Sequence, residues 1–138
     1  MGMSFHISAH REGPHASLVE CKSARIEIDT DLAGRLDAFN PAELLLAALA
    51  GCILKGIERV CPILQFQLRA VHVDIDGVRQ DVPPRLEAIS YRILVDTDES
   101  DARLNLLHEN VRKYGTVYNT VAPGTTLSGT LERFRHTS

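Results

Sequence analysis

One stretch constrains the fold of this chain more than any other: an apolar run with a cysteine at its middle, NPAELLLAALAGCILKGIERVC, at residues 40–61. Between residues 42 and 54 the only charged side chain is that of Glu43. A helix built from this run is apolar on nearly every side, and such a helix belongs in the centre of a fold. It is too short to cross a bilayer, which takes about 20 apolar residues. The sequence therefore predicts a buried central helix.

Both ends of this helix carry recognisable signals. Asn40 suits the N-cap, Pro41 suits the first helical position, and Glu43 completes a capping box three residues after the cap. At the other end, Pro62 disfavours a helical conformation in the residue before it, so the predicted last residue is Cys61.

Alternation of apolar and polar side chains predicts strands on both sides of the central helix. The expected strands are residues 3–10, 15–21, 23–29, 71–76, 85–96 and 125–135. The first three form an antiparallel meander with a turn at residues 11–14, and the next two form a hairpin. A polar loop, residues 30–39, leads into the central helix.

A second helix is predicted for residues 100–114, with Asp98 or Ser100 as its cap and Gly115 in the left-handed position after its end. Strands and helices that do not strictly alternate favour the α+β class, as a single domain over residues 1–138. Six short strands and one amphipathic helix are thin cover for the central helix. A second subunit is therefore expected to cover the remainder.

Composition excludes several classes of function. The 138 residues carry a formal net charge of -3, with a pI of about 6.0, which argues against nucleic acid as the main partner. Three cysteines without a CxxC pair form neither a disulfide framework nor a zinc site. No apolar N-terminal run is present, so no signal peptide or membrane anchor is expected, and a cytoplasmic location fits best.

Three histidines near the N-terminus are the only hint of a metal site. His6 and His10 share a strand face and His15 follows the turn, but no carboxylate or cysteine completes a recognised ligand spacing. They are interpreted as surface histidines, and neither a metal nor another cofactor is expected.

The central stretch resembles a known family. Asn40-Pro41, a following acidic residue, a Leu/Ala-rich run and Cys52 twelve residues after Asn40 are similar to the central-helix motif of the OsmC/Ohr proteins. These are osmotically induced and organic hydroperoxide resistance proteins of bacteria. The strand order is similar over nearly the whole chain. The resemblance implies an intertwined α+β homodimer with antiparallel sheets around a long buried helix and active sites at the subunit boundary.

In chemical terms the resemblance implies a thiol peroxidase. A cysteine thiolate attacks the O–O bond of a hydroperoxide, becomes a sulfenic acid and is resolved by a second cysteine. The attacking thiol needs a pKa below its usual value of about 8.5, normally through a nearby cation. Cys52 matches the peroxidatic cysteine in position. The alternative for Cys52 is a small buried hydrophobic side chain.

Three cations are candidates for activating this thiol. Arg11 in His-Arg-Glu-Gly resembles the Arg-Asp-Gly turn that supplies the thiolate-pairing arginine in Ohr proteins; the alternative is an exposed turn arginine. Lys55 and Arg59 share the helix face of Cys52 and could lower its pKa, or else extend to the solvent.

The acidic residue departs from the Ohr pattern. Ohr proteins carry it directly after Asn-Pro, where this chain has Ala42, and the acid follows as Glu43. Nine helical residues place Glu43 opposite Cys52 and about 13 Å away along the axis. Glu43 is a candidate catalytic residue by resemblance, but the helix cap explains it better.

The resolving cysteine is also missing, because Gly115 stands in its place. Cys61 cannot replace it within one chain, since about 13 Å of helix separates it from Cys52 and a disulfide needs Cα atoms within roughly 7 Å. Cys21 could approach only if its sheet brings it there. Tyr114 and Tyr118 flank the missing cysteine and either line the substrate pocket or pack in the core.

Two functions remain open from the sequence. The first is a hydroperoxide reductase that uses Cys52, activated by Arg11, with an external thiol as reductant. The second is a non-peroxidatic dimer of the same fold that binds a small hydrophobic ligand at the subunit boundary.

Overall fold

The computed structural model describes residues 2–135. These form two compact units, an N-terminal unit ending at Leu45 and a C-terminal unit beginning at Leu46. The class is α+β, as predicted, with two small sheets and a long helix. The prediction of a single domain over residues 1–138 stays a prediction.

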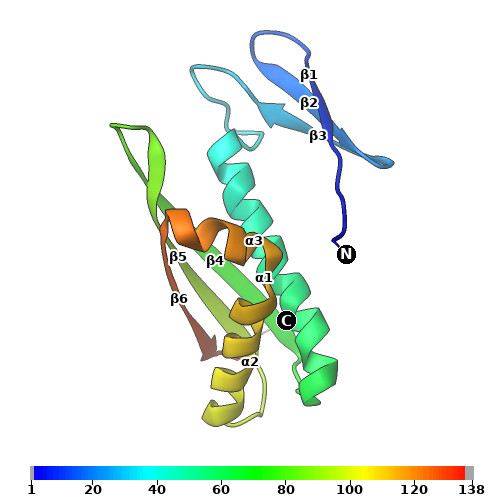
Figure 1. Cartoon of the computed structure of the whole chain (residues 1–138), viewed down its shortest axis with the longest axis vertical. Coiled ribbons are helices and arrows are strands. Elements are labelled where there is room, and N and C mark those ends of the chain that lie inside the picture. The colour runs from blue at the N-terminus through cyan, green and yellow to red at the C-terminus, as the bar shows by residue number, and fades with distance from the viewer. Residues whose placement is uncertain (1, 136–138) are drawn as a thin grey trace. The chain divides into compact units, whose positions relative to one another are not determined.

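The N-terminal unit contains the predicted meander, an antiparallel sheet in the order β1-β2-β3 (Figure 1). Its strands are β1 (Ser8–Arg11), β2 (Ala16–Cys21) and β3 (Ala24–Asp29). The predicted start of the first strand at residue 3 is wrong, because pairing begins where Ser8 lies opposite Glu20, near the end of β2. Arg11 was expected in the turn, but it ends β1 opposite Ser17.

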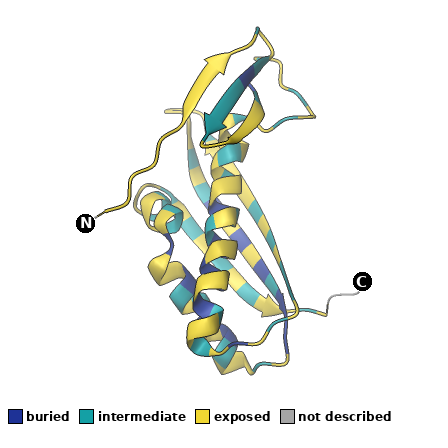
Figure 2. Ribbon diagram, turned by 90° about the vertical axis from the view of Figure 1, so that its right-hand side faces the viewer, coloured by how far each residue is buried: buried dark blue, intermediate teal, exposed yellow. Residues whose placement is uncertain are grey.

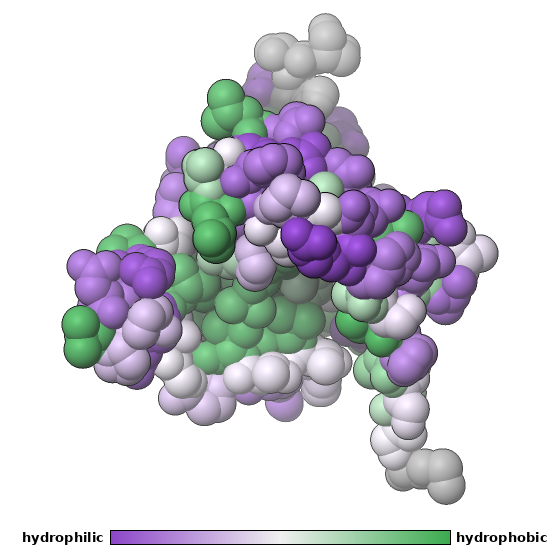
Figure 3. All heavy atoms as spheres, turned by 90° about the horizontal axis from the view of Figure 1, so that it is seen from above, coloured by the Kyte–Doolittle hydropathy of each residue, from purple (hydrophilic) through white to green (hydrophobic). Residues whose placement is uncertain are grey.

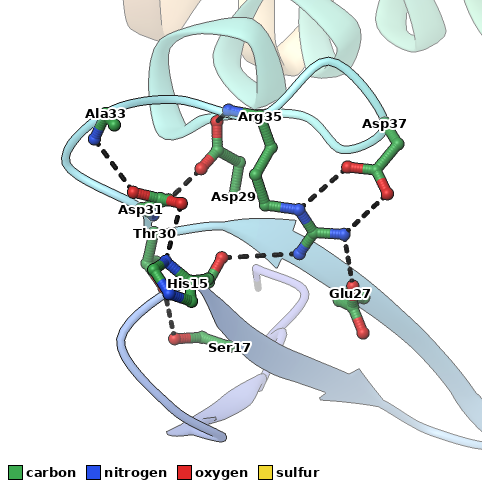
Figure 4. A network of polar contacts seen from close by, with 9 residues as sticks. All are labelled: His15, Ser17, Glu27, Asp29, Thr30, Asp31, Ala33, Arg35 and Asp37. Carbon is green, nitrogen blue, oxygen red and sulfur yellow. Dashed lines mark hydrogen bonds and ion pairs between the residues drawn. The ribbon is translucent and has the colours of Figure 1, made fainter.

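A polar network orders the loop after β3 (Figure 4). The buried carboxylate of Asp29 accepts hydrogen bonds from the backbone N–H groups of Asp31 and Arg35, each at 2.9 Å. The carboxylate of Asp31 accepts from the N–H of Ala33 at 2.9 Å and lies 2.7 Å from His15 Nδ1. Side chains therefore satisfy backbone donors that have no strand partner.

Arg35 joins this loop to the sheet. Its guanidinium donates two hydrogen bonds to Asp37, at 2.8 and 3.0 Å, and lies 2.8 Å from the carboxylate of Glu27 on β3. The pairing with Arg35 lowers the pKa of Asp37, and the hydrogen bond from Ala33 lowers that of Asp31. Asp31 and Asp37 are thus held in their ionised forms by their partners.

The central helix, α1 (Pro41–Leu64), begins as predicted. Asn40 N donates to Glu43 Oε1 at 2.9 Å and Glu43 N donates to Asn40 Oδ1 at 2.8 Å, which confirms the capping box. The predicted end at Cys61 is wrong, because Pro62 lies inside the helix. Gln65, at φ 52°, ends it, and Phe66 N donates to Cys61 O at 2.9 Å, a Schellman closure that fixes the last turn despite the proline.

The C-terminal unit contains a three-stranded sheet in the order β4-β5-β6 (Figure 1). The hairpin of β4 (Ala70–Gln80) and β5 (Arg85–Asp96) confirms that prediction. The last strand, β6 (Thr126–Arg133), runs parallel to β5, so the connection must cross over the sheet.

Helices make that crossover. The predicted second helix is α2 (Asp101–Tyr114), and its N-cap is Ser100, whose hydroxyl accepts from Arg103 N. Sequence reasoning missed α3 (Thr116–Val121) and the short η1 (Ala122–Gly124), because β-branched residues in Thr-Val-Tyr-Asn-Thr-Val disfavour a helix. The predicted left-handed conformation of Gly115 is wrong, because its backbone is extended, with φ -81° and ψ 116°.

The apolar core lies where α1 and α2 face the sheet (Figure 2). One side of α1 is buried there, through Leu49, Ile53, Gly56, Ile57 and Val60. Between residues 47 and 54 the opposite side is also apolar but exposed; it carries Ala47, Ala48, Gly51 and Leu54, and Lys55 and Glu58 follow on the same side. The expectation of a helix buried on every side is therefore met on one side only. The predicted covering subunit stays a prediction.

Within residues 2–135, no helix is both long enough and apolar enough to span a membrane.

Candidate functional site

Cys52 lies at the middle of α1, beside the buried stripe and partly exposed. Gly115, at the junction of α2 and α3, lies beside its sulfur. A Cβ atom added to Gly115 would lie 3.0 Å from Cys52 Sγ. The structure therefore brings the Cys52 sulfur next to Gly115, the position that the resemblance assigns to the resolving cysteine.

Space, and not backbone conformation, explains the glycine at 115. Its φ of -81° suits any residue, but an added Cβ would also lie 3.0 Å from Tyr118 Cβ and 3.2 Å from Val111 O. Contacts this short are tighter than normal carbon packing, so any side chain here needs its neighbours to move. Cys52 and Tyr118 thus both border the same point on Gly115.

Tyr118 belongs to a polar cluster that packs against the apolar core, in which only Tyr91 is fully buried. Its ring packs edge-on against Tyr91 of β5, with ring centroids 6.2 Å apart. The Tyr91 hydroxyl lies 2.6 Å from Nε2 of His108 on α2. The cluster consists of Tyr118, Tyr91 and His108, one from each of three elements.

Sequence reasoning missed Tyr91 and His108 as candidate site residues. Tyr91 lies on the predicted strand 85–96, between Ile89 and Ile93, and all three side chains are buried. The available signal was chemical: a phenol among aliphatic side chains needs a hydrogen-bond partner when buried. The sequence does not reveal that His108 supplies it.

Burial keeps Tyr91 and His108 neutral at neutral pH. Desolvation, with the charge of Arg112, lowers the pKa of His108 to about 4. Desolvation, with the Tyr118 hydroxyl nearby, raises the pKa of Tyr91. A neutral imidazole and an intact phenol are what an apolar surrounding favours.

The absence of a side chain at Gly129 makes room for the Tyr91 ring. Gly129 lies opposite Tyr91 in the parallel pair of β5 and β6, and a Cβ on Gly129 would lie 2.4 Å from three ring carbons. The ring therefore occupies the space that any larger residue at 129 would require.

Lys55 and Arg59 are exposed on α1, after Cys52. Neither side chain forms an ion pair or hydrogen bond with another described residue. Tyr114 is half exposed, and its ring faces the ammonium group of Lys113 at 5.3 Å. Their roles at the site stay predictions.

Arg11 and Glu43 belong to the N-terminal unit. Arg11 is exposed at the end of β1, and the carboxylate of Glu43 is engaged in the cap of α1. The catalytic roles assigned to both by resemblance stay predictions.

The other two cysteines differ from Cys52 in setting. Burial raises the pKa of the Cys61 thiol, and the nearby carboxylates of Glu58 and Glu99 raise it further. The thiol form of Cys61 is therefore favoured, which makes it a poor nucleophile. Cys21 ends β2 next to the turn, and all three cysteines are free thiols.

The described part of the chain contains no group of three or more His, Cys, Asp or Glu side chains that could hold a metal. His15 pairs with Asp31, and His10 lies 3.9 Å from Glu20. These exposed contacts fit the interpretation of surface histidines.

An α+β fold with a cysteine at the middle of its long helix belongs to a class of proteins that share a sequence family as well. The family model for OsmC-like proteins matches residues 33–128. The chain belongs to the OsmC-like protein family. No curated protein sequence matches it.

Solved structures with the same fold are distant in sequence. An OsmC-like protein from Mycoplasma pneumoniae is 18% identical, with a TM-score of 0.90 over 99% of this chain and 100% of the other. The organic hydroperoxide resistance protein OhrB of Bacillus subtilis is 14% identical, with a TM-score of 0.66 over 94% and 98%.

A third structure is a Vibrio cholerae protein proposed to be an organic hydroperoxide resistance protein, with captopril bound in one of its active sites. It is 16% identical, with a TM-score of 0.67 over 96% of this chain and 94% of the other. At such identities these comparisons establish the fold.

Proposed function

We propose that this protein is a hydroperoxide reductase that uses Cys52 without an internal resolving cysteine and is recycled by an external thiol. The observation that carries the proposal is the contact between the Cys52 sulfur and Gly115, where OsmC/Ohr proteins are expected to hold the resolving cysteine. Membership of the OsmC-like family and the shared fold with OhrB support it.

The reaction balances as two half-reactions. The Cys52 thiolate attacks the terminal oxygen of ROOH, the S–O bond forms, the O–O bond breaks, and the alkoxide leaves with the electron pair and takes a proton from water. One external thiol then displaces water from the sulfenic acid to form a mixed disulfide. A second thiol releases Cys52 and leaves as the external disulfide, so two electrons have reached the peroxide.

Cations near the sulfur supply the electrostatic help that the reaction needs. Lys55 and Arg59 follow Cys52 by three and seven residues, which keeps them on its side of α1. Arg11 is the activating arginine implied by the resemblance, and Glu43 is the acid that accompanies it. Tyr114 and Tyr118 border the substrate.

A homodimer completes this proposal. Between residues 47 and 54 the exposed side of α1 carries only small and apolar residues, among them Ala47, Ala48 and Leu54. Surfaces of this kind are buried in obligate dimers. Light scattering on the purified chain tests this, and a monomer at tens of micromolar would contradict it.

Peroxidase assays test the proposed activity. Purified wild-type protein with cumene hydroperoxide and dithiothreitol should consume peroxide, and Cys52→Ser should abolish turnover. Cys61→Ser is the matched control and should retain it. Turnover that survives in Cys52→Ser, or its absence in the wild type, overturns the proposal.

A gain of function tests the carrying observation directly. In a disulfide, one sulfur lies about 3.0 Å from the partner Cβ, as an S–S bond of about 2.05 Å requires. The same separation is found between Cys52 Sγ and a Cβ on Gly115. Gly115→Cys should therefore form a disulfide with Cys52 after one equivalent of peroxide. Gly115→Ala adds the same Cβ without sulfur and is the control for crowding.

The alternative function is a dimeric binding protein for a small hydrophobic ligand. The glycine at 115 also favours this, because it removes the sulfur that completes the two-cysteine cycle. The small molecule bound in the Vibrio cholerae relative supports a pocket of this kind. Mass spectrometry after one peroxide pulse discriminates: an unoxidised Cys52 favours the binding protein, and a sulfenic acid or mixed disulfide favours the enzyme.

A further inference from the structure

We propose that a cavity at the C-terminal end of α1 is a binding site for small organic cations that carry an apolar group, such as an arylalkylammonium ion. The cavity has a volume of about 640 Å³, within the range of about 300–1,000 Å³ that is typical of small-molecule sites. It lies between the last turns of α1 and the segment that leads into β4, entirely within the C-terminal unit.

This cavity is separate from the Cys52 site. Its wall includes Cys61, which follows Cys52 by about 13 Å along the axis of α1. Neither Cys52 nor Gly115 lines it. Binding here therefore does not depend on the proposed peroxidase chemistry.

One part of the cavity wall is apolar and well packed. Ile57 and Phe66 line it with only 1% and 4% of their surface exposed, and partly buried Leu68 lines it too. Ile57 and Phe66 belong to the core, and Leu68 packs against it. An apolar group of a ligand can leave water against these side chains, which favours binding of any charge type equally.

The polar part of the wall consists of acceptors without a positive partner. Glu58, Gln65 and Gln67 line the cavity and are exposed. Their side chains form no hydrogen bond or ion pair with any residue from 2 to 135. No Lys, Arg or His is among the described residues that line the cavity. A carboxylate with two amide carbonyls suits an ammonium group, which has donors only.

The charges near the cavity leave one carboxylate unbalanced. Burial raises the pKa of the Cys61 thiol on its wall, and the charges of Glu58 and Glu99 raise it further. Arg103 lies over the Phe66 ring, but it pairs with Glu99 at 3.2 Å, so these two charges offset each other. The charge of Glu58 remains. The C-terminal end of α1, with no basic residue in its last turn, adds to the negative potential.

Three probes of nearly equal size test the preference for a cation. The probes are 2-phenylethylammonium, 2-phenylethanol and 3-phenylpropionate, which share a phenylethyl group and differ in charge. In an NMR titration of the full chain, the ammonium ion should shift the backbone amides of residues 65–68. It should bind about tenfold more tightly than the propionate, because Glu58 attracts one and repels the other. Added salt should weaken binding of the ammonium ion and leave that of phenylethanol unchanged.

A variant locates the charge that is responsible. Glu58→Gln keeps the shape of the side chain and should weaken ammonium binding about threefold, the effect of one exposed ion pair. Glu109→Gln is the matched control, because Glu109 is an exposed glutamate on α2 that does not line the cavity. It should bind the ammonium ion as the wild type does.

Each other outcome overturns the inference. Equal affinity for the ammonium ion and the propionate shows that charge does not select the ligand. Equal weakening in Glu58→Gln and Glu109→Gln shows that Glu58 is not the acceptor. Amides of residues 65–68 that shift with none of the probes show that the cavity takes no small ligand, as when a second copy fills it. Cys52→Ser should bind the ammonium ion normally, so failure of the proposed peroxidase function leaves this inference standing.

Discussion

The N-terminal and C-terminal units of the chain are stabilised by different kinds of interaction. Among residues 2–45 only two are buried, Ser17 and Asp29, and both are polar. Every fully buried hydrophobic residue of the described chain lies beyond Leu45. One unit is organised by hydrogen bonds and ion pairs, and the other by apolar packing.

This difference shows what each kind of interaction achieves. The network of Asp29, Asp31 and Arg35 fixes the backbone of a loop but covers no apolar surface. Leu32 and Leu36 of this loop are fully exposed, at 104% and 109%. Apolar side chains, green in Figure 3, accordingly reach the surface. The loop therefore satisfies its polar groups with hydrogen bonds, while the apolar surface of its two leucines stays exposed to solvent.

The largest effect is expected from the core of the C-terminal unit. Leu107 is 0% exposed, so Leu107→Ala should lower the free energy of unfolding by about 2–5 kcal/mol. Urea denaturation followed by circular dichroism measures this. Leu106→Ala, one position along and 37% exposed, is the control, and an equal loss in both variants would refute the assignment of the core.

The next effect should come from the close packing of β5 and β6. In Gly129→Ala the new methyl group would lie 2.4 Å from the Tyr91 ring, which must move. Overpacking of this kind costs about 1–3 kcal/mol. Gly124→Ala meets nothing within 4 Å and serves as the control. Equal thermal stability of the two variants would show that Tyr91 is not clamped.

A smaller and local effect is expected in the N-terminal unit. Asp29→Ala removes the acceptor of two backbone N–H groups, which should cost about 1–3 kcal/mol for the local structure. Hydrogen exchange should accelerate at Asp31 and Arg35 while the amides of β5 stay protected. Uniform acceleration in both units would contradict their separate stabilisation.

Acid should affect the same unit first. The lowered pKa values of Asp31 and Asp37 mean that their contribution to stability is complete above the unfolded value of 3.8. It is lost as the pH falls through the lower, folded values. Hydrogen exchange measured between pH 5 and pH 2.5 should show the loop of residues 30–39 opening before the C-terminal core. Simultaneous opening would sink this prediction.

The smallest effect on the isolated chain is expected for Leu36→Ala. A fully exposed leucine contributes within about 0.5 kcal/mol to a monomer. If a second copy covers it, the variant should lose stability only at protein concentrations that favour the dimer. Thermal unfolding across a hundredfold range of concentration measures this, and a loss independent of concentration would contradict it.

The same comparison explains what the sequence could reveal. The cap of Asn40 and Glu43 was predictable because its partners lie three residues apart. The hairpin was predictable because its strands alternate regularly. The bonds of Asp29 to loop amides were not, since they depend on the path of a loop without periodicity.

At the site, only the residues of the family motif could be predicted from the sequence. Cys52 and the empty position at Gly115 followed from the motif, and the structure brings them together. The partnership of Tyr91 with His108 joins a strand to a helix 17 residues later, and no local pattern encodes it. The parallel pairing of β6 escaped prediction for the same reason, because its register is set by the crossover.

Gly115 also bears on how this site could evolve. A glycine codon can become a cysteine codon by a single base change, and the extended backbone at this position suits any residue, although Tyr118 and the Val111 carbonyl must shift to admit the new Cβ. The sulfur of Cys52 already lies where a second sulfur could bond to it. Under the proposed function, such a change would place two cysteines within disulfide reach, and a lineage that acquired it could replace the external thiol with an internal one.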